Sequence, residues 1–251
     1  MKLLALDTSS EGCSAALLVD GELTERFEVA SRGHTRLLMP MVRSLLSGQG
    51  LAPVDLDALA FACGPGSFTG LRIATGVVQG MAWGLELPVV PVSSLEAVAF
   101  GAIEAFDARE GDAIAVAFDA RMGEVYWGCY EIRRGFPRLM GKERVCPPSA
   151  VRLEGDSGRW LGAGPGWQFR SDMPSDVTEQ MAMVEPDLLL RASWVARLAE
   201  SALADGRTVP ASQAQPVYIR DEVAWKNFPA GPEYPGWSTR FQSCPLSFIL
   251  G

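Results

Sequence analysis

The glycine-rich segment at residues 64–72 (GPGSFTGLR) is the stretch of this chain best suited to chemistry. Its three glycines and one proline predict a tight turn, and Ser67 and Thr69 offer N-caps for the helical pattern that follows. A glycine-rich turn that opens a helix exposes backbone N–H groups at the positive end of the helix dipole, where phosphate binds. A turn that joins a strand to a helix without any ligand has the same pattern, so both interpretations stay open.

Histidine and cysteine chemistry is limited by composition. His34 is the only histidine, which excludes a mononuclear metal site built on two or three histidines and leaves no robust Ser/His/Asp set. The five cysteines form no CxxC pair and are odd in number, so we expect reduced thiols in a cytoplasmic protein without a signal peptide. No apolar run is long enough to span a membrane, and we expect no membrane contact.

The chain has 251 residues, enough for one large domain or two small ones. Its net charge is −8 and its pI is about 4.8. Nucleic-acid binding needs clustered Lys and Arg, so an acidic chain is not expected to bind nucleic acid by itself. The charge leaves open a subunit of an RNA-acting complex.

The elements that would position these residues form two similar halves. Strands are expected at residues 2–6, 13–19, 22–30, 58–63 and 89–92, and helices at 35–47, 68–85 and 95–105. The first strand ends at Asp7 and a polar turn, and a strand at 113–118 ends in the same way at Asp119 before a returning strand at 124–130. This repeat predicts an internal duplication, with two lobes and both Asp turns facing a cleft. Asp187 is expected to cap a helix at 188–204.

Two of the expected helices carry unusual surfaces. The apolar residues of 35–47 cover an arc of roughly 200°, wider than one core-facing stripe needs. In 68–85, Gly76, Gly80 and Gly84 recur every four residues, although each helical glycine costs up to about 1 kcal/mol relative to alanine. Such a stripe indicates close approach of another backbone, from the same chain or from a partner. Arg72 lies in the first turn, where the dipole disfavours a cation, so we expect a partner for it: an acidic side chain across a subunit contact or a carbonyl in the same lobe.

Four segments together resemble the bacterial TsaB (YeaZ) family. They are residues 6–9 (LDTS), 64–72, 119–126 (DARMGEVY) and 216–226 (PVYIRDEVAWK), in matching order and spacing over residues 1 to 226. The resemblance implies an α/β, two-lobed actin-like or Hsp70-like ATPase fold. It divides the chain into an N-terminal lobe at 1–106, a C-terminal lobe at 107–226 and an irregular tail at 227–251. The helix near 187–204 is then able to pack back onto the first lobe.

The resemblance also implies a role in making N6-threonylcarbamoyladenosine in tRNA. Family members are paralogues of TsaD, which transfers the threonylcarbamoyl group to tRNA, and a small ATPase, TsaE, completes the complex. TsaD holds a metal with an HxxxH pair and an aspartate, and a chain with one histidine lacks that pair. We therefore expect a non-catalytic partner subunit that needs no cofactor, pairs with TsaD, reaches tRNA only through the complex and is able to form a homodimer alone. The expected partner interface consists of Leu38, Met41, Val42, Leu45, Arg72, Gly76, Gly80 and Gly84.

The main alternative is a nucleotide-binding ATPase or phosphotransferase of the same fold, with ATP or ADP in the cleft or at the complex interface. Asp7 and Asp119 would then orient a magnesium ion. Against this, neither Asp turn has the glycine that kinases of this fold place directly after Asp-x. A peptidase of the M22 type is a third, weaker alternative. The expected nucleotide-cleft residues are Asp7, Thr8, Ser9, Gly64, Gly66, Asp119, Gly162 and Gly164.

Overall fold

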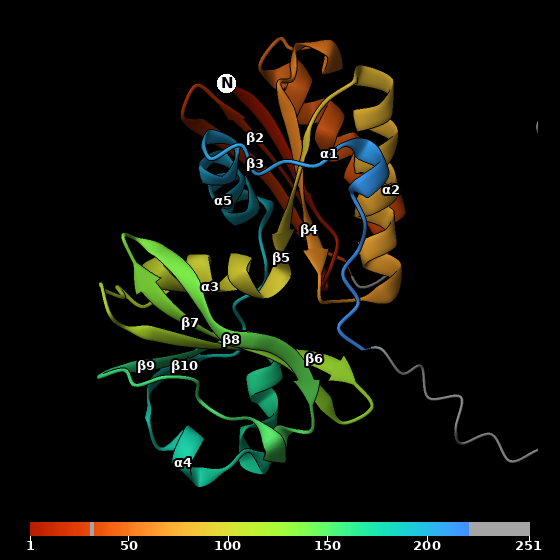
Figure 1. Cartoon of the computed structure of the whole chain (residues 1–251). Helices are drawn as coiled ribbons and strands as arrows, with labels where there is room; N and C mark the ends of the chain where they lie inside the picture. The colour runs from red at the N-terminus through yellow and green to blue at the C-terminus, as the bar shows by residue number, and fades with distance from the viewer. Residues whose placement is uncertain (31–32, 221–251) are drawn as a thin grey trace, which may run out of the picture. The chain divides into compact units, whose positions relative to one another are not determined.

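The computed structural model describes residues 1–30 and 33–220, and residues 1–219 form one compact unit. Its first sheet has the strand order β3-β2-β1-β4-β5 (Figure 1). These strands are β1 (Lys2–Asp7), β2 (Gly12–Val19), β3 (Glu22–Val29), β4 (Ala58–Gly64) and β5 (Val89–Ser93). The first three form an antiparallel meander, whereas β4 and β5 run parallel to β1.

The second sheet has the order β10-β9-β6-β7-β8. Its strands are β6 (Ala113–Arg121), β7 (Glu124–Arg133), β8 (Phe136–Cys146), β9 (Trp160–Ala163) and β10 (Met181–Glu185). Again an antiparallel meander is extended by two parallel strands. Read from the other edge, the order repeats that of the first sheet strand for strand, so the chain is a duplicated α/β protein with two mixed five-stranded sheets.

The helices are α1 (His34–Gly48), α2 (Phe68–Leu85), α3 (Ser94–Ala105), α4 (Ser175–Thr178) and α5 (Ala192–Ala204). Helix α3 follows the first sheet but packs on β6, β7 and β8, whereas α5 follows the second sheet and packs on β1, β2, β4 and β5 (Figure 1). A hydrogen bond from the Ala192 backbone N–H to Ser14 Oγ, 2.9 Å long, joins α5 to β2. Among the described residues, no helix is long and apolar enough to cross a membrane.

Local signals set most of these boundaries. Ser67 caps α2 by accepting a hydrogen bond from the Gly70 N–H, and Ser93 caps α3 in the same way. The Asp20–Gly21 turn has positive φ at both residues, as a tight hairpin between β2 and β3 requires. The prediction for Asp187 was wrong, because α5 begins four residues later, after Arg191 in extended conformation. The expected tail at 227–251 lies outside the described residues, and the lobe boundary near residue 106 stays a prediction.

Candidate functional site

The Asp7–Ser9 turn at the end of β1 is buried inside the fold. Asp7 and Thr8 have no exposed surface and Ser9 has 2%. The Ser9 N–H donates to Asp7 Oδ1 at 2.9 Å, while Asp7 Oδ2 and Ser9 Oγ have no hydrogen-bond partner among the described residues. Burial raises the pKa of the Asp7 carboxyl to about 7, against the opposing effect of the hydrogen bond from the Ser9 N–H.

Thr8 connects this turn to helix α2. Its hydroxyl donates to the Gly70 carbonyl at 2.7 Å and accepts from the Ala74 N–H at 3.2 Å. The Ser67 N–H also donates to the Ser9 carbonyl, at 2.7 Å. The glycine-rich segment and the Asp7 turn therefore bind each other directly.

The glycines of this segment allow that close approach. A Cβ atom on Gly66 would lie 2.5 Å from the Ser9 carbonyl oxygen, and one on Gly70 would overlap the Thr8 carbonyl oxygen. Gly64 has a φ of +124°, and its Cβ would lie 2.5 Å from the Val217 carbonyl oxygen. Crowding by the chain's own backbone thus explains these glycines without a phosphate.

In the second half of the chain, the glycines of the expected nucleotide cleft are also crowded by the chain's own atoms. A Cβ atom on Gly162 would lie 2.6 Å from the Trp167 ring, and one on Gly164 2.7 Å from the Ala117 carbonyl oxygen. Asp119 Oδ1 accepts from the Arg121 N–H at 2.7 Å, and Asp119 Oδ2 pairs with the Arg121 guanidinium at 3.3 Å.

The Asp7 and Asp119 carboxylates are a poor donor set for magnesium. The first is buried with a raised pKa and the second already pairs with the Arg121 guanidinium, whereas Mg²⁺ binds accessible ionised oxygens. No group of three or more His, Cys, Asp or Glu side chains suited to a metal occurs within residues 1–30 and 33–220.

Helix α2 also has a face, formed by its glycine stripe, that no described part of this chain covers. Gly76, Gly80 and Gly84 are exposed, and a Cβ atom on any of them would meet nothing within 4 Å. The close backbone approach expected from the sequence is therefore not made by another described part of this chain. Near the two ends of the stripe, Phe68 is 56% exposed and Trp83 75% exposed.

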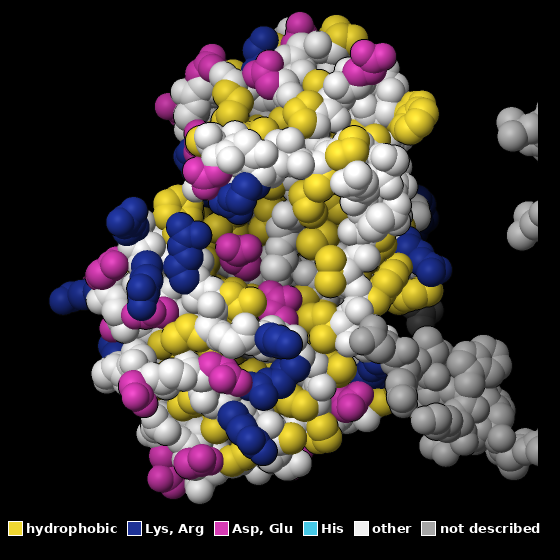
Figure 2. All heavy atoms as spheres, viewed as in Figure 1, with side chains coloured by type: hydrophobic (Ala, Val, Ile, Leu, Met, Phe, Trp, Pro, Cys, Tyr) yellow, Lys and Arg dark blue, Asp and Glu magenta, His cyan; other side chains and the backbone are white. Residues whose placement is uncertain are grey.

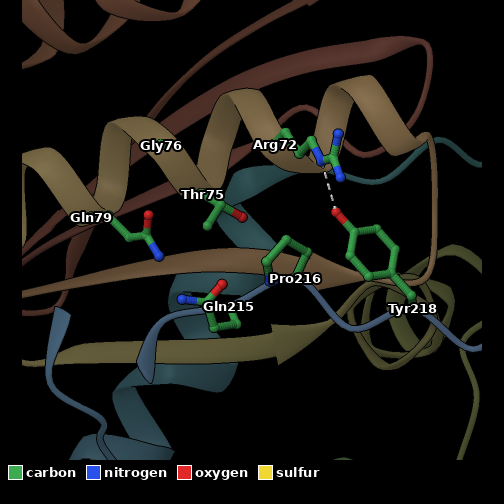
Figure 3. Close-up of a pocket in the computed structure, with 7 residues that line it drawn as sticks. All are labelled: Arg72, Thr75, Gly76, Gln79, Gln215, Pro216 and Tyr218. Atoms are coloured by element: carbon green, nitrogen blue, oxygen red, sulfur yellow. Dashed lines mark hydrogen bonds between the residues drawn. The ribbon is translucent and has the colours of Figure 1, made fainter. Parts of the chain in front are cut away.

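Arg72 is fixed at the N-terminal end of this face. Its guanidinium carbon lies 3.6 Å from the centroid of the Phe68 ring, and its Nε donates to the Tyr218 hydroxyl at 3.1 Å (Figure 3). Phe68 and Tyr218 contact each other with ring centroids 5.5 Å apart. Within the described residues its partners are thus two aromatic side chains and not a carbonyl group, and an acidic partner from another subunit stays a prediction.

A pocket of about 280 Å³ opens beside Arg72, between α2 and the segment at residues 215–218 (Figure 3). Thr75 is 4% exposed, and its Oγ1 has no hydrogen-bond partner among the described residues. Gln79 donates to the Ala214 carbonyl at 2.8 Å and fixes the segment along the helix. The remaining lining residues are Gly76, Gln215 and Pro216.

The structure corrects the expectation for helix α1. Leu38, Val42 and Leu45 are 1–2% exposed and pack in the core beneath the first sheet, and Met41 packs partly against the same core. Helix α1 lies against β2, β3 and α2, which cover its apolar arc. These side chains therefore do not form a free surface, and the expected interface is reduced to the α2 face.

Comparisons with known proteins identify the family of this chain. A family model described as TsaD, tRNA N6-adenosine threonylcarbamoyltransferase, matches residues 27–152. The chain is 40% identical over 233 residues to the tRNA threonylcarbamoyladenosine biosynthesis protein TsaB of Escherichia coli (strain K12), covering 91% of this chain and 99% of that protein. The protein of the same name from Haemophilus influenzae is 38% identical over 237 residues, covering 91% and 98%.

Among solved structures, YeaZ from Pseudomonas aeruginosa superposes with a TM-score of 0.82 at 47% identity, covering 87% of this chain and 99% of that one. Matches of this identity, which extend over nearly the whole length of each relative, define a family and not only a fold. The chain belongs to the TsaB (YeaZ) family of tRNA threonylcarbamoyladenosine biosynthesis proteins.

Proposed function

We propose that this chain is a non-catalytic partner subunit of the TsaD threonylcarbamoyltransferase, acting with TsaE in the cytoplasm to form N6-threonylcarbamoyladenosine in tRNA. The observation that carries the proposal is the bare face of α2. Three exposed glycines allow another helix to approach closely, and Phe68 and Trp83 supply apolar surface beside them. Tryptophan and glycine on one exposed face are expected to be covered in an assembly.

The candidate residues of this chain support a subunit without catalytic activity. The single histidine removes the HxxxH pair, and the Asp7 and Asp119 turns are occupied by contacts within the chain. The alternative of an independent ATPase is weakened by the same contacts, because a phosphate would have to displace the Thr8 and Ser9 backbone from the glycine-rich segment. ATP or ADP at the interface with TsaD is compatible with this proposal, and so is a homodimer through α2 when TsaD is absent.

The experiment is a reconstitution with purified TsaD, TsaE, tRNA and a source of threonylcarbamoyladenylate. We expect modified tRNA only when this chain and TsaD are both present, and no ATP or peptide hydrolysis by this chain alone. Modification by TsaD at full rate without this chain would refute the proposal, and so would turnover by this chain alone.

A matched pair of variants tests the place of contact. Trp83 and Val54 are each 75% exposed, but only Trp83 lies on α2. Trp83→Ala should lower the affinity for TsaD by about tenfold or more, seen as loss of the complex in size-exclusion chromatography. Tryptophans that become buried in an interface are frequent hot spots of binding. Val54→Ala should leave the affinity unchanged. Equal effects of the two substitutions would place the contact elsewhere.

A further inference from the structure

Positive charge is concentrated in one part of this acidic chain. Residues 133–152 contain six Lys or Arg residues and a single carboxylate, Glu143, although the whole chain carries a net charge of −8. Four of the six cations lie on the β7–β8 hairpin with exposed side chains, and we call this set the basic ribbon: Arg133, Arg134, Arg138 and Lys142. Figure 2 shows Lys and Arg side chains gathered over the hairpin labelled β7 and β8 in Figure 1.

From this arrangement we infer that the basic ribbon binds the phosphate backbone of tRNA while the chain is in its complex with the transferase. The inference rests on the proposed function, which places a tRNA beside this subunit. A cluster of exposed cations is the surface that a polyanion recognises.

The carboxylate within the segment does not neutralise the ribbon. Glu143 points into the fold, where its Oε1 accepts hydrogen bonds from Ser93 Oγ and from the Tyr130 hydroxyl, the latter 2.5 Å long. Burial raises the pKa of this carboxyl and so favours its neutral form.

Ion pairing leaves most of the ribbon available. Arg133 pairs with Glu131 at 2.7 Å. Within the described part of the chain, no carboxylate lies within 4 Å of the charged groups of Arg134, Arg138 or Lys142. The contact between Arg134 and Glu110 uses the backbone N–H and leaves the guanidinium free for other contacts. These three cations carry the proposal.

The ribbon also has a defined shape. Arg134 and Gly135 have φ values of +54° and +73°, as a tight turn between antiparallel strands requires. Arg134 lies in this turn, and Arg138 and Lys142 follow on β8, where their four steps extend for about 13 Å at about 3.3 Å per residue. A paired two-stranded ribbon holds its cations with little loss of backbone entropy on binding.

One half-buried carboxylate, Glu96 on α3, lines a small pocket together with Arg138 and Arg207. Burial raises the pKa of Glu96, and the two arginines oppose that rise. Glu96 therefore weakens the field of Arg138 only in part. Arg207 is itself paired with Asp205 at 3.1 Å and is not counted with the ribbon.

The test uses the complex of this chain with TsaD and a fluorescently labelled tRNA, with binding measured by anisotropy over a series of salt concentrations. The triple variant Arg134→Ala/Arg138→Ala/Lys142→Ala removes three phosphate contacts. Each contact contributes about 0.7 to the slope of log K against log salt on single-stranded RNA. We expect the slope to fall by about 2 and the affinity at 0.1 M salt to fall about 10- to 100-fold.

The matched control is Arg26→Ala/Arg36→Ala/Arg43→Ala, which removes three exposed arginines from β3 and α1 and should leave tRNA binding unchanged. Size-exclusion chromatography and thermal melts of all three proteins separate the possible failures. Absence of a complex with the unmodified chain would refute the proposed function. A normal complex whose triple variant keeps the affinity and salt slope would overturn the ribbon proposal alone. A triple variant that folds but loses TsaD binding would also overturn it and identify the ribbon as a protein contact.

Discussion

The substitution Gly80→Leu tests the α2 face most directly. A Cβ atom at Gly80 meets nothing within 4 Å, so leucine fits without moving any described neighbour. Replacing a helical glycine by leucine removes a cost of up to about 0.8 kcal/mol, which in a chain of this size raises Tm by about 2–3 °C. In a complex, however, the same side chain would enter the space that a partner helix occupies. Overpacking typically costs about 1–3 kcal/mol, which corresponds to about 5- to 150-fold weaker binding to TsaD.

The assay combines thermal melting with titration of TsaD. Gly48→Leu is the control, because Gly48 ends α1, is also exposed and meets nothing within 4 Å. Gly48→Leu should change neither Tm nor the affinity for TsaD by much. A Gly80→Leu chain with a raised Tm and normal affinity for TsaD would show that the stripe is not the contact. A lowered Tm would contradict the open surroundings of Gly80 and refute the structural argument itself.

Three further predictions concern the interior. Asp7 has a folded pKa of about 7, above its unfolded value of 3.8, so the chain should lose up to about 4 kcal/mol of stability as pH rises from 4 to 7. Asp7→Asn should abolish that loss in urea titrations at pH 5 and pH 8, and an unchanged pH dependence would mean that Asp7 is not the cause. Gly70→Ala should lower stability by about 1–3 kcal/mol, because its Cβ overlaps the Thr8 carbonyl oxygen; an unchanged urea midpoint would contradict that crowding. Glu143→Ala should cost about 1–3 kcal/mol by leaving Tyr130 and Ser93 without their acceptor, and Glu143→Gln should recover most of it in thermal melts.

Local signals made much of the fold predictable. Helix α2 begins and ends at the residues expected from the sequence, since the Ser67 cap and the surrounding turn residues lie within the segment. The repeated strand–Asp–turn pattern correctly predicted two halves of the same topology. By contrast, the strand β9 was not among the strands expected from the sequence, where Gly162 was named only as a residue of a nucleotide cleft. It has only four residues, and Gly162 within it packs against Trp167, a contact that a short pattern does not reveal.

The candidate site was less predictable, because residues distant in the sequence determine which of its surfaces are covered. Periodicity identified the apolar arc of α1, but only the tertiary fold shows that β2, β3 and α2 cover it. In the same way, the segment at 64–72 has the composition of a phosphate loop. Its crowding atoms, the carbonyl oxygens of Thr8 and Ser9, come from a turn about 60 residues earlier. No local pattern distinguishes a glycine that approaches a ligand from one that approaches its own chain.

Two groups of glycines in this chain therefore have different physical reasons. Gly66, Gly70 and Gly164 would each bring a Cβ atom against a backbone carbonyl of the same chain, so alanine would be strained there. The glycines of the α2 stripe meet nothing, and yet together they cost the helix up to about 3 kcal/mol relative to alanine. No contact among the described residues offsets that cost. A helix of a second molecule, packed closely along the stripe, would offset it, which is why the α2 face is the strongest sign of a partner in this structure.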